Sequence, residues 1–422
     1  MPLLLTNATF IDWQSLTFTQ THLLVEDGED GNVKFVGDIS LYPDCQIIDC
    51  TGKLVTKSFA VGHHHAYSAM AKGMPAPKKN PENFHEILQY VWWNLDKCLD
   101  KETIEYSALI TAMACARAGS TFVIDHHASP NYIKGSLEIM AKAFEKVGIG
   151  HLLCYEITDR DGIEKAGQGL DETAGYLQNH QGLVGLHASF TVGDNTLKNS
   201  VTLANQFDTG IHIHVAEDLY DQIHCEKTWH KRVVQRLADA GAMESSKSLL
   251  VHCLHLDENE RRLIESSPLW LVQNAESNMN NNVGYFNGSG LGERILFGTD
   301  GMHSDILQSA KAAFFVGQRF DNITYPSSYQ RFRNVHHYLR SNNFSGDRDN
   351  NLVVLDYRSG TEINQNNFLG HFIFGINATH ITDVISQGKL IVKNREIQTV
   401  NEAEILRESI IHASNLWDRM RR

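Results

Sequence analysis

Residues 59–65 read Phe59-Ala60-Val61-Gly62-His63-His64-His65, a short apolar run that ends in three consecutive histidines. Successive side chains of a β-strand point to opposite faces, so His63 and His65 are expected on one side and His64 on the other. Two imidazoles on one strand form half of a binding site for a divalent metal ion. A structural histidine cluster would show the same pattern, so the interpretation depends on the rest of the chain.

Short apolar runs of this kind recur along the chain. Counting residues 59–65, eight short apolar runs alternate with helical stretches; the others are 120–127, 149–157, 183–190, 211–217, 248–256, 270–274 and 295–300. Helices are expected at 101–118, 136–147 and 221–240. Apolar strands separated by helices indicate a parallel sheet buried on both faces, and eight such units favour closure. The sequence therefore predicts an α/β fold, a (β/α)8 TIM-type barrel.

Both ends of the chain have a different pattern, with several short stretches that are expected to be β-strands. The expected strands lie at 3–11, 22–26, 33–36 and 46–49, and later at 352–357, 372–376, 382–386 and 389–393, before a closing helix at 402–421. Neither group is large enough for a core of its own. We expect residues 1–58 and 346–422 to form one small accessory β-sandwich domain beside a barrel of residues 59–345. Residues 323–350 are polar and show no regular period.

Composition limits the classes of partner. The 422 residues carry a formal net charge of -13, which argues against nucleic acid and anionic membranes and leaves a small-molecule substrate. The seven cysteines are scattered and form no CxxC pair, a pattern typical of reduced thiols in a cytoplasmic protein. The first residues do not resemble a signal peptide, and no apolar run is long enough to span a membrane.

Polar side chains with metal-ligand or acid–base chemistry occur at the ends of three other runs. These residues are His214, Glu217, His252 and Asp300. In a parallel barrel the C-terminal ends of the strands meet at one face, so these side chains should converge with the first histidines. An aspartate that closes an apolar strand is costly unless it is paired or bound to metal. Each residue also has a structural interpretation, such as a strand histidine bonded to a loop.

Together these stretches resemble the amidohydrolase superfamily, in its cytosine/adenosine-deaminase-related branch, and within that branch the SsnA-like aminohydrolases. The matching stretches are 62–69, 124–130, 186–192, 212–218, 274–281 and 298–301. The resemblance implies one bound metal ion, Zn²⁺ in preference to Fe²⁺. The implied ligands are His63, His65, His214 and Asp300. It also implies a homodimer.

The resemblance further implies catalytic roles. Glu217 and His252 would act as acid–base and water-orienting groups, and Asp300 as general base besides its role as a ligand. The expected substrate-binding residues are His187, Tyr67, His303 and His127. For His126, His127, Trp92 and Trp93, pocket lining and ordinary packing both remain open.

Two departures from the family pattern stand out. Lys57-Ser58 replaces the usual Pro-Gly before the first strand, and His303 stands where relatives often have a small residue. Some binuclear relatives bridge two metals with a carbamylated lysine on the fourth strand. The run 183–190 contains no lysine, which favours one metal.

The resulting hypothesis is a metal-dependent aminohydrolase that deaminates an amino-substituted N-heterocycle, such as a purine or pyrimidine, with metal-activated water and release of ammonia. The alternatives on the same scaffold are a chlorohydrolase and a cyclic-amide hydrolase, because activated water serves all three reactions. A non-catalytic metal-binding barrel would be expected to lack Asp300 or Glu217, and both are present. A barrel whose histidines bind phosphate is disfavoured, since no glycine-rich phosphate loop precedes a helix.

Overall fold

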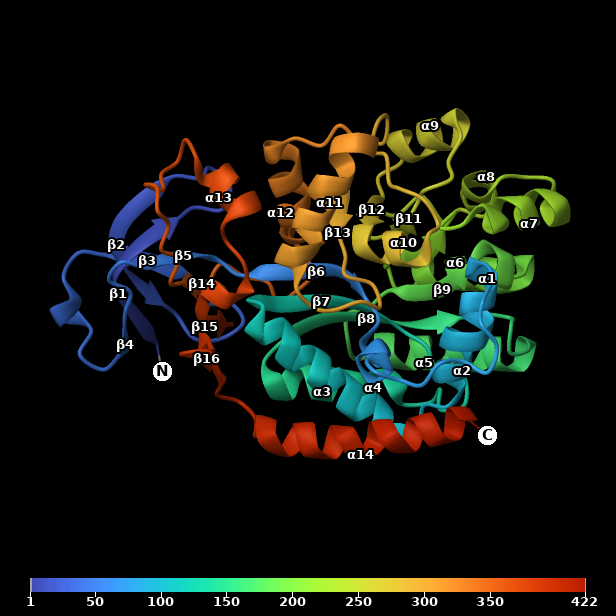
Figure 1. Cartoon of the computed structure of the whole chain (residues 1–422), viewed down its shortest axis with the longest axis horizontal. Coiled ribbons are helices and arrows are strands. Elements are labelled where there is room, and N and C mark those ends of the chain that lie inside the picture. The colour runs from blue at the N-terminus through green and yellow to red at the C-terminus, as the bar shows by residue number, and fades with distance from the viewer. Residues whose placement is uncertain (1, 422) are drawn as a thin grey trace.

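A parallel barrel forms the body of the molecule. The computed structural model describes residues 2–421. The barrel strands are β6 (Phe59–His64), β7 (Ser120–His127), β8 (Gly150–Ile157), β9 (Val184–Ala188), β10 (Ile211–Val215), β11 (Leu249–His252), β12 (Trp270–Gln273) and β13 (Ile295–Phe297). Neighbouring strands pair in chain order and in parallel (Figure 1). A parallel bridge between His64 and Asp300 joins the last strand region to the first. The predicted (β/α)8 class is confirmed.

Close contact between β6 and β13 explains why residue 62 is a glycine. A Cβ atom at Gly62 would lie 2.7 Å from the carbonyl oxygen of Phe297, too close for any side chain. Next to it, the backbone N–H groups of Thr299 and Asp300 both donate to the carbonyl of His63, at 2.9 and 3.1 Å. These contacts place the ends of the two strands side by side, which is where the metal ligands are expected.

Helices cover the outside of the barrel and close it at one end. They are α3 (Lys101–Arg117), α4 (Ser136–Val147), α5 (Ile163–Leu177), α6 (Asp194–Gln206), α7 (Leu219–Trp229), α8 (Val233–Asp239), α9 (Glu258–Ser266), α10 (Ala275–Asn281), α11 (Ile306–Phe320) and α12 (Tyr325–Ser341). The single helix predicted at 221–240 is wrong. His230 adopts a left-handed conformation (φ 56°) that ends α7, and a second helix, α8, follows. No described helix is both long and apolar enough to cross a membrane.

Helix α12 was not expected from the sequence, because residues 323–350 are polar. It begins at a capping box between Thr324 and Ser327. Several of its polar side chains are buried and hydrogen-bonded: Arg333 donates to the carbonyls of Lys57 and Ser58. Val335, Tyr338 and Leu339 pack into the interior of the barrel. Its buried face therefore mixes polar and apolar residues, and the polar ones obscure the helical period in the sequence.

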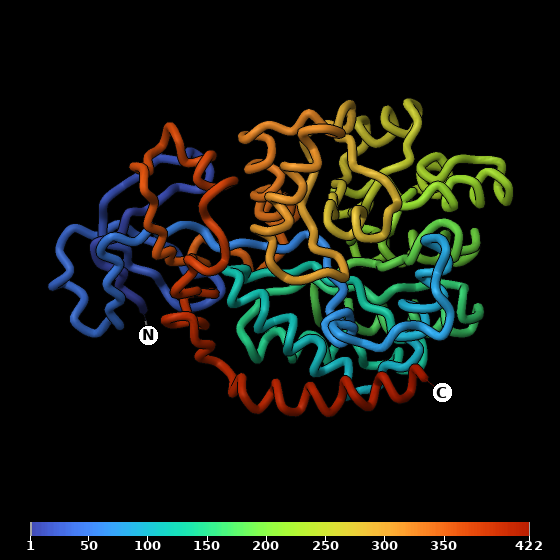
Figure 2. The backbone as a smooth tube through the Cα atoms, viewed as in Figure 1, coloured from blue at the N-terminus to red at the C-terminus, as the bar shows by residue number. Residues whose placement is uncertain are grey.

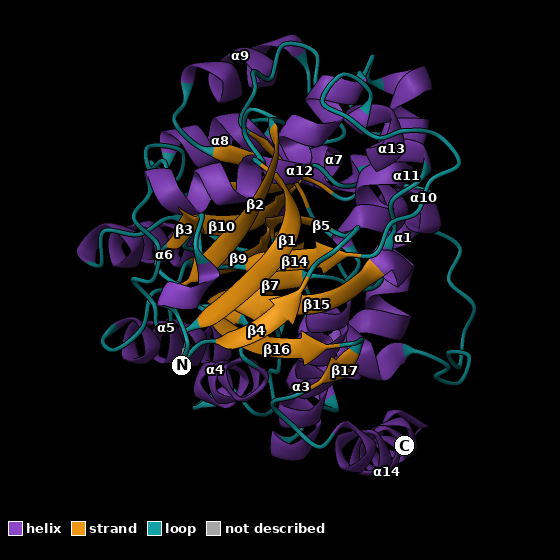
Figure 3. Ribbon diagram, turned by 90° about the vertical axis from the view of Figure 1, so that its left-hand side faces the viewer, coloured by secondary structure: helices purple, strands orange, loops and turns teal. Residues whose placement is uncertain are grey.

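Strands from both ends of the chain form one accessory sheet. They are β1 (Leu3–Ile11), β2 (Phe18–Val25), β3 (Val33–Val36), β4 (Gln46–Asp49), β5 (Leu54–Lys57), β14 (Leu352–Leu355), β15 (Ile381–Ser386), β16 (Lys389–Lys393) and β17 (Glu396–Ile397). The two ends meet where β5 pairs antiparallel with β14 (Figures 2 and 3). The sheet carries a small core of its own, which includes Leu5, Leu23 and Ile385.

Two helices complete the C-terminal region. The strand predicted at 372–376 is wrong, because Phe368–Phe374 forms helix α13. Phe368 and Phe372, four residues apart, are buried on one side of it, whereas Phe374 is exposed. The aromatic residues of α13 lie at helical spacing, but in the sequence their close succession resembled the apolar run of a strand. The predicted closing helix is confirmed as α14 (Glu402–Arg421), which lies along α3 (Figure 1).

Candidate metal centre and substrate pocket

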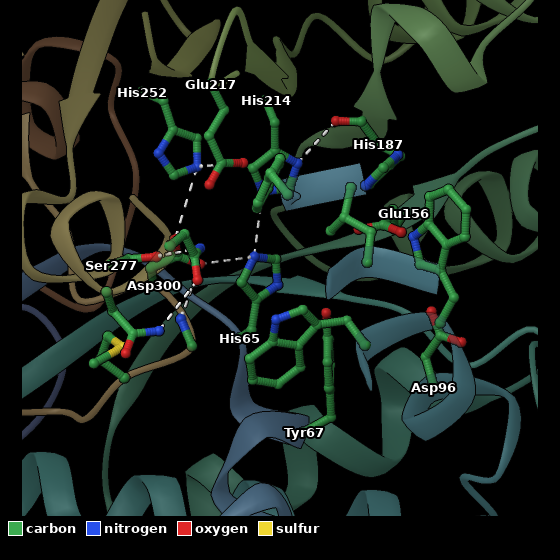
Figure 4. A pocket seen from close by; sticks show the side chains of 18 of the residues that line it. His65, Tyr67, Asp96, Glu156, His187, His214, Glu217, His252, Ser277 and Asp300 are labelled. Atoms are coloured by element: carbon green, nitrogen blue, oxygen red, sulfur yellow. Dashed lines mark hydrogen bonds and ion pairs between the residues drawn. The ribbon is translucent and has the colours of Figure 1, made fainter. Parts of the chain in front are cut away.

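The predicted metal ligands converge at the C-terminal face of the barrel. His63 lies near the end of β6 and His65 just after it, while His214 lies in β10 and Asp300 follows β13. In Figure 4, His65, His214 and Asp300 point toward one another. The Oδ1 atom of Asp300 lies 3.2 Å from Nε2 of His65 and 3.7 Å from Nε2 of His63. The ligand atoms of His63, His65 and His214 all lie within 4.8 Å of one another.

Hydrogen bonds at the other ring nitrogens set the tautomers of these histidines. Nδ1 of His65 donates to the carbonyl of His126 at 2.7 Å, and Nδ1 of His214 donates to that of His187 at 2.8 Å. A neutral imidazole with hydrogen on Nδ1 has a lone pair on Nε2. The two Nε2 atoms nevertheless lie 3.2 Å apart.

A cation resolves this arrangement of facing lone pairs. Nε2 of His63 is also buried and has no hydrogen-bond partner within residues 2–421. Three inward-facing nitrogen lone pairs beside one carboxylate are the donor set that zinc and similar divalent ions take in proteins. His63, His65, His214 and Asp300 therefore fit a metal ion, and their buried donors are difficult to explain otherwise.

Three strand ends adopt left-handed backbone conformations at non-glycine residues. The φ values are 46° at Ala216, 72° at His252 and 50° at Asp300. Such conformations cost on the order of 1–3 kcal/mol each and cluster at functional sites, where the surrounding structure holds them in place. Here they occur at the positions where β10, β11 and β13 end and the site residues begin.

Glu217 and His252 lie beside the metal ligands. Nε2 of His252 is 3.4 Å from Oε2 of Glu217 and 3.7 Å from Oδ2 of Asp300. The side-chain amide of Asn278 donates to Nδ1 of His252 at 2.8 Å, so Nε2 carries the hydrogen of the neutral ring. His252 therefore presents a donor to the space between two carboxyl groups.

The pKa values of Glu217 and Asp300 are shifted in opposite directions. Burial and the nearby Asp300 carboxylate raise the pKa of Glu217 well above its usual value. Burial also opposes ionisation of Asp300, but the adjacent rings of His63 and His65 outweigh it and hold the pKa of Asp300 well below the usual range. One carboxyl group thus retains a proton and the other is an anion, an arrangement suited to acid and base roles.

A pocket opens over these residues. It is lined by His65, Tyr67, Phe84, Leu88, Trp92, Trp93, Asp96, Glu156, Arg160, His187, His214, Glu217, His252, Ser277, Asn280, Asn281, Asp300, Gly301 and Met302. Tyr67 and His187, predicted to bind substrate, are among them. The two tryptophans, whose role was open, also line it.

Two other predicted substrate contacts lie outside this lining. His127 is buried and its Nε2 is hydrogen-bonded to Ser129 Oγ at 2.9 Å. His303 donates from Nε2 to Glu276 at 2.8 Å and accepts at Nδ1 from the backbone N–H of Asp305. Both side chains have protein partners, so their contact with substrate remains a prediction only.

One wall of the pocket, apart from its two tryptophans, was missed in the sequence. Helix α1 (Phe84–Ile87), the π-helical turn Leu88–Trp92 and α2 (Trp93–Lys97) follow one another without a break. They contribute Phe84, Leu88, Trp92 and Asp96 to the lining, a spacing of four residues. That spacing was the available signal, since residues four apart share one face of a helix.

These features define a barrel protein with a candidate metal centre, and the comparison with known families agrees. The profile of the Amidohydrolase family matches residues 60–331. The match spans more than half of the chain, so the chain belongs to the amidohydrolase family. The resemblance seen in the sequence is confirmed.

Named relatives align over most of the chain. A 5-methylthioadenosine/S-adenosylhomocysteine deaminase from Syntrophomonas wolfei is 24% identical over 383 residues, which cover 85% of this chain and 86% of that protein. A 5'-deoxyadenosine deaminase from Methanopyrus kandleri is 25% identical over 423 residues, covering 92% of this chain and 94% of that protein.

Solved structures share the fold. An adenosine deaminase from Xanthomonas campestris with bound zinc has a TM-score of 0.82 at 17% identity, covering 99% of this chain and 98% of that one. The atrazine chlorohydrolase TrzN from Arthrobacter aurescens, complexed with zinc, has a TM-score of 0.82 at 13% identity, covering 97% and 100%. Likeness at these identities establishes the fold alone.

Proposed function

We propose that this protein is a metal-dependent aminohydrolase that deaminates an amino-substituted N-heterocycle of the purine or pyrimidine class. The observation that carries the proposal is the buried set of three imidazole lone pairs and one carboxylate, with the carboxyl group of Glu217 and a histidine donor beside it. The names of the aligned relatives, which are deaminases of adenine nucleosides, support the substrate class.

The proposed cofactor is one divalent metal ion, Zn²⁺ in preference to Fe²⁺, held by His63, His65, His214 and Asp300. Strand β9 (Val184–Ala188) contains no lysine that could bridge a second ion. When bound, a divalent cation of this kind lowers the pKa of a water molecule from about 15.7 towards about 7.

The proposed roles of the side chains follow from their protonation. Asp300, an anion, accepts the proton of the water that adds to the ring carbon bearing the amino group. Glu217, which retains a proton, donates it to the adjacent ring nitrogen. His252 donates from Nε2 to the oxygen that gains negative charge. The amino group then leaves as ammonia with the proton from Asp300, and the hydroxyl proton of the adduct passes to Glu217 as the C=O bond forms, which restores both side chains. Each such acid or base typically contributes about 10²–10⁴-fold to the rate.

Hydrolytic dechlorination is the second candidate, because the zinc-containing chlorohydrolase has the same fold. A cyclic-amide hydrolase is the third. The metal ligands do not discriminate among these reactions, since each begins with attack by activated water. The product discriminates: ammonia, chloride or a ring-opened acid.

The test is a product assay on zinc-loaded protein over aminopurines, aminopyrimidines, chlorotriazines and cyclic amides. We expect ammonia from at least one aminated heterocycle and a loss of at least 10²-fold in the matched variant Glu217→Gln. Chloride or ring-opened acid as the main product would select an alternative. No hydrolysis of any substrate class by fully metal-loaded protein would contradict the proposal.

Three finer predictions accompany the function. All seven cysteines are free, which supports a reducing compartment, and we propose the cytoplasm. The net charge of -13 supports a protein that does not bind nucleic acid. A homodimer remains a prediction from the family resemblance.

A further inference from the structure

A cluster of buried charges lines the pocket on the side away from Asp300. Asp96 and Glu156 lie there (Figure 4), and Glu156 also lies near one metal ligand, because one of its oxygens is within 4.8 Å of a ring nitrogen of His214. The guanidinium group of Arg160 lies between three carboxylates. It donates to Glu156 Oε1 at 2.5 Å, to Asp161 Oδ2 at 3.3 Å and to Asp96. The side chains of Arg160, Asp96 and Glu156 are all less than one-tenth exposed.

The carboxylates outnumber the cations in this cluster. Lys97, at the protein surface, pairs with Asp161 at 3.1 Å and neutralises it from outside. Apart from the ring of His126 beside Glu156, Asp96 and Glu156 share Arg160 as their cation partner within residues 2–421, which leaves a formal excess of one negative charge when all three groups are ionised.

His126 lies beside Glu156 without a hydrogen bond to it. Its Nε2 is directed at the carbonyl oxygens of Leu186 and His212, at 3.1 and 3.3 Å, and therefore carries a hydrogen. Nδ1 faces Oε2 of Glu156 at 3.3 Å, and this nitrogen has no hydrogen-bond partner within residues 2–421.

One oxygen of Asp96 lacks a hydrogen-bond partner. Oδ1 of Asp96 is buried and has no hydrogen-bond partner within residues 2–421, and the residue is 2% exposed. Burial raises the pKa of Asp96 to about 7 against the opposing effect of Arg160, and the like charges of Glu156 and Asp161 add to the rise. A buried acceptor without a partner costs about 1–3 kcal/mol, which a donor on a ligand would recover.

We infer that this acidic end of the pocket, formed by Asp96, Glu156 and Arg160, binds a cationic hydrogen-bond-donating group of the substrate, such as an ammonium or amidinium group, and rejects carboxylates and phosphates. The inference rests on the proposed function, since it concerns how the same pocket binds the substrate. The excess negative charge favours a cation, and the unpartnered oxygen of Asp96 requires a donor.

The test uses aminopurines that carry side chains of equal length ending in ammonium, hydroxyl or carboxylate. Calorimetry on the zinc-loaded Glu217→Gln variant measures their affinities without turnover. We expect the ammonium compound to bind at least tenfold more tightly than the hydroxyl compound, and the carboxylate compound to bind most weakly. Equal affinity for all three, or tighter binding of the hydroxyl or carboxylate compound, would overturn the inference.

Matched substitutions, made in the same Glu217→Gln background, locate the effect. Asp96→Asn should reduce the preference for ammonium at least fivefold, and Glu156→Gln provides a second variant if the first does not fold. Asp161→Asn removes a carboxylate from the same arginine but outside the pocket lining, so it should leave the preference unchanged. An unchanged preference in both Asp96→Asn and Glu156→Gln, or equal losses in all three variants, would overturn the assignment.

The two proposals fail in different ways. If the native enzyme releases ammonia from these compounds with no preference for the terminal group, the inference about the acidic end is wrong and the function stands. If the ammonium compound binds selectively but no ammonia is released from any aminopurine, the proposed deamination is wrong and the binding inference stands.

Discussion

Nε2 of His252 lies 3.4 Å from Oε2 of Glu217, although the two residues end different strands of the barrel. On its other side, the same nitrogen lies 3.7 Å from Asp300. A hydrogen-bond donor therefore faces the space between a carboxyl group that retains its proton and one that is an anion. This relationship places the proposed acid, base and oxygen-stabilising donor around one point.

Replacement of Glu217 tests the acid role. In Glu217→Gln the side chain keeps its size and can still donate a hydrogen bond, but it cannot transfer a proton. We expect kcat for ammonia release to fall about 10²–10⁴-fold, with the metal content unchanged. Steady-state kinetics and elemental analysis of the same preparation measure both quantities. A variant that keeps more than half of the native kcat would exclude this role for Glu217.

Replacement of His303 tests a residue that the sequence placed in the substrate site. His303 bonds to Glu276, and neither residue lines the pocket. We expect His303→Ala to change KM and kcat less than threefold and to lower the free energy of unfolding by about 1 kcal/mol or less, since the pair is partly exposed. His187→Ala, at a position that lines the pocket, is the control and should raise KM. A tenfold rise in KM for His303→Ala would instead support the direct contact.

A buried histidine far from the site predicts how stability depends on pH. His336, on α12, is 1% exposed and donates from Nδ1 to Asp347 at 2.7 Å. Burial lowers its pKa from 6.5 to about 4 in the folded chain. Protonation therefore favours the unfolded chain, and the contribution of His336 is present above pH 6.5 and is lost as the pH falls toward 4. At pH 5 the loss is roughly 2 kcal/mol.

The variant His336→Asn isolates this contribution. Its amide can donate to Asp347 but does not titrate, so the free energy of unfolding should fall less steeply between pH 7 and pH 5 than in the native protein. Urea unfolding at both pH values measures the difference. Identical slopes in the two proteins would show that His336 does not set this pH dependence.

The barrel was predictable because its strands are buried on both faces and therefore read as apolar runs. The strand-end residues, such as His214 and Asp300, were predictable for a related reason: a polar residue at the end of an apolar run is conspicuous. Helix α12 was not predicted, since buried polar residues such as Arg333 and Asn334 interrupt the apolar pattern by which a helix is recognised in sequence. The run of aromatic residues in α13 was compatible with the period of a helix and with that of a strand.

The acidic end of the pocket was missed for a different reason. Asp96 and Arg160 are 64 residues apart, and neither ends an apolar strand. In sequence, each resembles a solvated charge in or beside a helix. Only the fold brings them together under Trp93, and only burial makes the interaction between the two charges large. Glu156, near the end of strand β8, was the one member of the cluster that showed the strand-end pattern.

The central claim is that one metal ion, held by three histidines and Asp300, makes this chain a deaminase. The most direct measurement is the rate of ammonia release from an aminated heterocycle while metal-free protein is titrated with zinc. We predict that the rate rises linearly and reaches its plateau at one zinc per chain, and that Asp300→Asn shows no such rise. Full ammonia release by metal-free protein, or a plateau that requires two metals per chain, would contradict the account.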